Sequence, residues 1–76
     1  MLKWTKISPT LYTTESDGFF AHVIKIGNSW KFSIDTPDQI CAYVYGDRYS
    51  KNEPLRTANH AKHAAACQLM LMMEES

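Results

Sequence analysis

The sequence predicts an α+β fold in two layers, an antiparallel sheet of three to four strands packed on one C-terminal helix. Three observations predict it. Before Gly46, apolar and polar side chains alternate along several short segments. Pairs typical of turns, such as Asp17-Gly18 and Gly27-Asn28, separate those segments. The segment after Thr57 contains neither glycine nor proline and is rich in alanine, which favours a helix.

The first extended segments are residues 4–7 and 11–14, and Ser8-Pro9 separates them. Because proline cannot donate a ladder hydrogen bond, we expect this first strand to bend there or to lie at a sheet edge. Asp17-Gly18 is a strong hairpin signal. The next strand is predicted at residues 19–26, directly after that turn.

Residues 29–35 alternate cleanly, with Trp30, Phe32 and Ile34 on one face, so we expect one face of this strand to be buried. The register against residues 19–26 has two alternatives. A two-residue loop at Gly27-Asn28 leaves three large apolar residues on the polar side, namely Phe20, Ile24 and Ile26. A three-residue loop that ends at Ser29 places Phe20, His22, Ile24 and Ile26 beside the apolar row instead. We favour the three-residue loop because it sorts apolar from polar side chains better, although the turn chemistry favours the two-residue loop.

A turn at residues 36–38 precedes a further strand at residues 40–45, and a polar loop follows over residues 46–56. Thr57 is the expected N-cap of the helix. On a helical wheel, one stripe of the helix is apolar and begins with alanines that allow a close approach to the sheet. The predicted core is Trp30, Phe32, Ile34, Ile24, Val44, Ala61, Ala65 and Leu69.

The composition describes one domain over residues 1–76. The chain balances 8 Lys and Arg against 8 Asp and Glu, and 45% of its residues are hydrophobic, which is too apolar for a disordered tail. No apolar run is long enough to span a membrane. Two cysteines, Cys41 and Cys67, are too few for a disulfide scaffold, and the first residues form no apolar signal core, so we expect a cytoplasmic protein with reduced thiols.

The C-terminal half of the helix is apolar all the way round, whereas a helix on one sheet buries a single stripe. Met70 and Leu71 fall on the outer side with Cys67 and Glu74, and methionine adapts readily to a partner surface. We predict a protein interface at Cys67, Met70, Leu71 and Glu74. The alternative is that Leu2 or Trp4 covers Met70.

A nucleic-acid interface is the second hypothesis. In the favoured register Lys25 and Lys31 share the outer face of the sheet. The long loop adds basic residues and an aromatic residue that can stack on a base. The candidate residues are Lys25, Lys31, Arg48, Tyr49, Lys51 and Arg56. The balanced charge argues against this function, since a dedicated binder of this length usually carries a basic excess.

Catalytic and metal sites have less support. His60, His63 and Cys67 share one side of the helix, but no paired Cys-x-x-Cys motif accompanies them, so we favour solvated side chains over a zinc site. No motif fixes a reaction or a cofactor, and we expect a non-enzymatic protein.

The order of turns and strands resembles the small strand-rich proteins with one C-terminal helix that phages and prophages encode. The resemblance rests on Asp17-Gly18-Phe19, Gly27-Asn28-Ser29-Trp30 and the closing helix with Ala61-Lys62-His63. Some such proteins inhibit host defence systems, CRISPR complexes among them, by binding protein surfaces. The resemblance implies a partner that is a host protein or protein complex. A homodimer through the C-terminal helix is a second expected partner.

Overall fold

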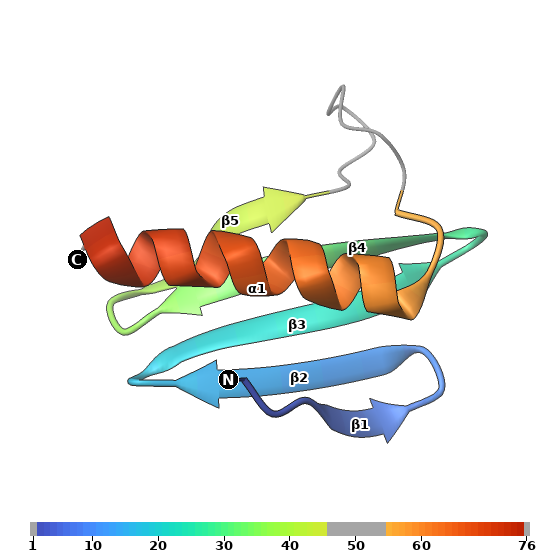
Figure 1. Cartoon of the computed structure of the whole chain (residues 1–76), viewed down its shortest axis with the longest axis horizontal. Coiled ribbons are helices and arrows are strands. Elements are labelled where there is room, and N and C mark those ends of the chain that lie inside the picture. Colours follow the sequence, from blue (N-terminus) through green and yellow to red (C-terminus); the bar gives the residue numbers. More distant parts are fainter. Residues whose placement is uncertain (1, 46–54, 76) are drawn as a thin grey trace.

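The computed structural model describes residues 2–45 and 55–75, which form one antiparallel sheet and one helix (Figure 1). The two-layer α+β architecture is confirmed, but the sheet has five strands rather than three to four. The strands lie in sequence order, each paired with its neighbours along the chain. Their bounds are β1 Thr5–Ser8, β2 Leu11–Ser16, β3 Phe19–Ile26, β4 Ser29–Thr36 and β5 Gln39–Tyr45, and α1 spans Ala58–Glu75.

The additional strand comes from the break at Ser8-Pro9. This break is a full turn rather than a bend, and it folds β1 back onto β2, with Thr5 opposite Thr13. Ser8 Oγ accepts a 3.3 Å hydrogen bond from the Thr10 amide within the turn. The short β1 then lies at the sheet edge, one of the two outcomes expected for a strand interrupted by proline.

The β3–β4 loop is the two-residue loop, so the three-residue register that we favoured is wrong. Ile26 pairs with Ser29 and Val23 with Phe32. Gly27 has a φ of +62°, and a glycine with positive φ at the first loop position is typical of a type II′ turn, which matches the twist of a hairpin. The β2–β3 turn is equally regular, because Asp17 and Gly18 have φ values of +52° and +83°, as a type I′ turn requires.

The β4–β5 connection is less regular, because Pro37 holds its φ negative and excludes a primed turn. The register shifts between Ile34 and Thr36, and Cys41 adopts a φ of +54°, which is unusual for a residue with a side chain. The Cys41 amide donates a 2.8 Å hydrogen bond to Asp35 Oδ1, which stabilises this bulge.

The core lies between α1 and the inner face of β3 and β4. The predicted core residues Trp30, Phe32, Ile34, Ala61, Ala65 and Leu69 are all buried. Ile24 and Val44 are corrections, since they are 36% and 44% exposed on the opposite face. The remaining core residues, which the sequence analysis did not predict, are Phe19, Ala21, Val23 and Leu55.

Two tyrosines of β5 extend the core beyond the helix. Tyr43 and Tyr45 stack on Phe32, with ring centroids 5.9 and 5.2 Å away. Beyond the described end of β5, Leu55 returns to the sheet and bridges to Trp30 of β4. Tyr45 and Leu55 therefore close the core on the β5 side, where α1 does not extend over the sheet.

Candidate interaction surface at the end of the helix

The position of α1 is set by its N-cap and by its stripe of small residues. Thr57 Oγ1 accepts a 3.1 Å hydrogen bond from the His60 amide, which confirms Thr57 as the N-cap. Ala61, Ala65 and Leu69 are fully buried against the sheet. One stripe of the helix therefore packs against β3 and β4 (Figure 1). The candidate site lies on the remaining sides of its last two turns.

Met70 and Leu71 project away from the core, with 58% and 53% of their surface exposed. Cys67 and Glu74 are exposed as well, so the four residues of the predicted interface are all accessible. Leu2 and Trp4 pack against the core cluster and leave Met70 open, so the alternative packing is not what the structure shows. The exposure that the wheel predicts is confirmed; the role of these residues as an interface stays a prediction.

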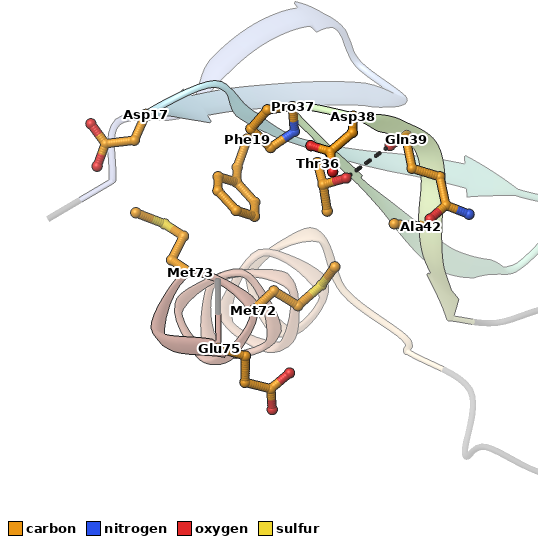
Figure 2. A pocket seen from close by; sticks show the side chains of 10 residues that line it. All are labelled: Asp17, Phe19, Thr36, Pro37, Asp38, Gln39, Ala42, Met72, Met73 and Glu75. Carbon is orange, nitrogen blue, oxygen red and sulfur yellow. Dashed lines mark hydrogen bonds between the residues drawn. The ribbon is translucent and has the colours of Figure 1, made fainter.

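A cleft of about 640 Å³ opens beside this end of the helix. Met72 and Met73 of α1 and Phe19 of β3 point toward one another across it, and the β4–β5 turn forms its far wall (Figure 2). Thr36 Oγ1 donates a 3.4 Å hydrogen bond to the Gln39 carbonyl and steadies that wall. The cleft was not predicted from the sequence, because its lining residues come from β3, α1 and the β4–β5 turn, which are far apart along the chain.

The charge around the cleft is negative. Asp17, Asp38 and Glu75 are among its lining residues, and no lysine or arginine is among the described residues that line it. Figure 2 shows Glu75 pointing away from the strands, so its carboxylate acts from the outer rim. The carboxyl end of α1 carries no basic residue in its last turn and adds the negative end of the helix dipole. The site combines methionine and phenylalanine side chains with an acidic surround.

The helix cluster of His60, His63 and Cys67 is exposed to solvent. Cys67 Sγ lies 3.7 Å from His63 Nε2, one turn away, and this is a weak contact. In residues 2–45 and 55–75, no group of three or more His, Cys, Asp or Glu side chains is arranged to hold a metal ion.

The structure separates the residues of the predicted nucleic-acid interface. Lys31 lies on the outer face beside Ile24, whereas Lys25 pairs with Trp30 on the helix side of the sheet. The expectation that the two lysines share one face is therefore wrong, because it depended on the three-residue loop. Arg56 is exposed just before α1. Arg48, Tyr49 and Lys51 lie outside the described residues.

No protein-family model matches the chain, and neither the curated proteins nor the solved structures contain a match to it. Within the described residues, no helix is long and apolar enough to cross a membrane.

Proposed function

We propose that the protein is a small, non-enzymatic interaction module that binds a partner protein through the C-terminal end of α1. The observation that carries the proposal is the exposure of Met70 and Leu71 beside a cleft lined by Met72 and Met73. Of the five consecutive apolar residues at 69–73, Leu69 is buried and Met72 and Met73 pack against the core. Met70 and Leu71 therefore exceed what the core requires. Flexible, polarisable methionine side chains suit a surface that must adapt to another protein.

The acidic surround indicates the chemistry of the partner. Asp17, Asp38 and Glu75 favour a surface that presents a lysine or arginine next to an apolar side chain. The apolar residues then contribute affinity by burial, and the carboxylates contribute orientation and association rate. That the partner is a host protein complex and that the chain comes from a phage are predictions from the resemblance.

The test is affinity capture from a host lysate treated with nuclease, using the parent chain and the double variant Met70→Glu/Leu71→Lys. We expect the parent to retain a defined protein partner and the double variant to lose it while its circular dichroism and melting temperature stay unchanged. The matched control is His60→Glu/His63→Lys, which introduces the same two charges on the N-terminal half of the same helix and should retain the partner.

Equal capture by the parent and the double variant would contradict this assignment of the surface. Recovery of nucleic acid alone, lost after nuclease treatment, would support the nucleic-acid hypothesis instead. A double variant that unfolds would show that Met70 and Leu71 stabilise the fold rather than bind a partner.

A further inference from the structure

The face of the sheet that points away from α1, here called the outer face, carries a row of large apolar side chains. Phe20, Ile24 and Ile26 lie on this face of β3, with His22 between the first two, and are 43%, 36% and 52% exposed. Val44 of β5 is 44% exposed on the same face, as its pairing with Ser33 shows. In the described part of the chain, the only helix lies on the opposite face (Figure 1). An open apolar face of this kind marks a contact surface.

The centre of the outer face is hollowed. A depression of about 260 Å³ lies between Ile24 and Val44, with the small Ser33 between them. Lys31 and Cys41 complete its exposed rim. The depression can receive a side chain from a facing surface, as interdigitated sheets require.

Opposite charges mark the two ends of the outer face. Lys31 and Asp35 stand on the same side of β4, about 13 Å apart at the usual rise per residue. Asp35 is fixed in place, because it accepts the 2.8 Å hydrogen bond from the Cys41 amide and lies 3.1 Å from His22 Nε2. The face therefore carries apolar side chains on both sides of the row formed by His22 and Ser33, with a basic group at one end and an acidic group at the other.

This pattern is complementary to itself. We propose that the outer face binds a second copy of this chain, sheet against sheet. The twofold axis lies between the two sheets and runs perpendicular to the strands. Such an axis reverses the two ends and sets Lys31 of one copy against Asp35 of the other. With that pairing, the axis passes over the row formed by His22 and Ser33, which are paired neighbours in the sheet. Phe20 then faces Ile24 of the second copy, and Val44 faces its own counterpart.

The other twofold arrangement, with the axis parallel to β3, is disfavoured by charge. It lays β4 of one copy over β2 of the other and brings Asp35 against Glu15, since both residues pair with Phe20. Two facing carboxylates are destabilising. In the favoured arrangement Glu15 faces Leu11 on β2, and His22 faces its own counterpart on the axis.

The face is large enough for an interface between two copies. At about 3.3 Å per residue and about 4.8 Å between strands, the five strands cover roughly 500 Å² on each copy. The total for two copies is close to the roughly 1,000 Å² that a specific interface requires.

The first experiment measures the mass of the parent chain by light scattering after size exclusion, from micromolar to millimolar concentration. We expect a mass that approaches twice that of one chain. Ile24→Lys should weaken the association by at least about tenfold, because it places a charge in the apolar centre. Met70→Glu/Leu71→Lys, which alters the helix surface, should leave it unchanged. A parent that stays monomeric at millimolar concentration overturns the proposal.

The second experiment tests the geometry and does not depend on the folding of Ile24→Lys. In a Cys41→Ser/Cys67→Ser background, a short bis-maleimide crosslinker should join two copies of the Val44→Cys variant, because the axis brings the two copies of this position together at about the 10 Å spacing of packed sheets, which a direct disulfide does not span. Met70→Cys in the same background is the control and should not crosslink. The absence of a Val44→Cys crosslink, or a dimer broken only by the helix variant, overturns the proposal. Neither result bears on capture of a partner by α1.

Discussion

Replacement of Ala65 by phenylalanine tests how closely α1 lies against the sheet. Ala65 is fully buried in the stripe that faces β3 and β4, and its neighbours in the core include the fully buried Ala21 and Val23. A phenylalanine side chain finds no room there and must displace the helix. Overpacking costs about 1–3 kcal/mol, and the lower helix propensity of phenylalanine adds about 0.5 kcal/mol. The free energy of unfolding should therefore fall by at least about 1.5 kcal/mol.

For a domain of this size, each kcal/mol lowers the melting temperature by about 4–8 °C, so Ala65→Phe should lower it by at least about 6 °C. Differential scanning calorimetry measures the change. His63→Phe is the matched control, because His63 is exposed on the same helix. Histidine and phenylalanine also have similar helix propensities, so this replacement changes little except the bulk of an exposed side chain. An unchanged melting temperature for Ala65→Phe would refute the packing of this stripe against the sheet.

Three further stability predictions can be measured by urea unfolding. Thr57→Ala removes the acceptor of the His60 amide and should cost about 1 kcal/mol, whereas Thr57→Gly should cost only a few tenths. Leu69→Ala leaves a cavity at a fully buried position and should cost about 2–5 kcal/mol; a smaller loss would show that the helix end collapses into the gap. Cys41→Gly should be neutral or should stabilise the fold by up to about 1 kcal/mol, because the backbone has a φ of +54°. Cys41→Val should destabilise the fold, and the reverse order of these two variants would contradict the bulge at this position.

The helix could be predicted from the sequence because its signals are local. The Thr57 N-cap, the absence of glycine and proline, and the spacing of Ala61, Ala65 and Leu69 determine both its start and its buried stripe. The number of strands was missed for the opposite reason. Whether Pro9 bends one strand or separates two depends on pairing between residues far apart along the chain, which the local pattern does not contain.

The register of β3 was mispredicted because the sorting of side chains was given more weight than the turn. Gly27-Asn28 does form the two-residue loop that its chemistry favours. Sorting the side chains by polarity requires a polar outer face, and it therefore placed Phe20 and Ile24 on the inner face and only Ile24 in the predicted core. The core instead takes Ala21 and Val23, because small side chains on β3 allow the alanines of α1 to approach closely. The two-residue loop at Gly27-Asn28 therefore predicts the exposed apolar residues of β3, which the favoured register placed on the inner face.

The two proposed surfaces lie on different layers of the molecule, and this placement has a consequence for binding. Sheet-to-sheet association through Ile24 would leave the C-terminal end of each α1 on the outside of the dimer, with Met70 and Leu71 accessible in both copies. A dimer would then engage a repetitive or immobilised partner at two points, and the second contact would form at a high effective concentration. Ile24→Lys should therefore weaken capture by an immobilised partner at high density while the affinity for the same partner free in solution stays equal to that of the parent. Surface plasmon resonance at two partner densities distinguishes these cases, and equal losses at both densities would mean that the outer face contacts the partner directly.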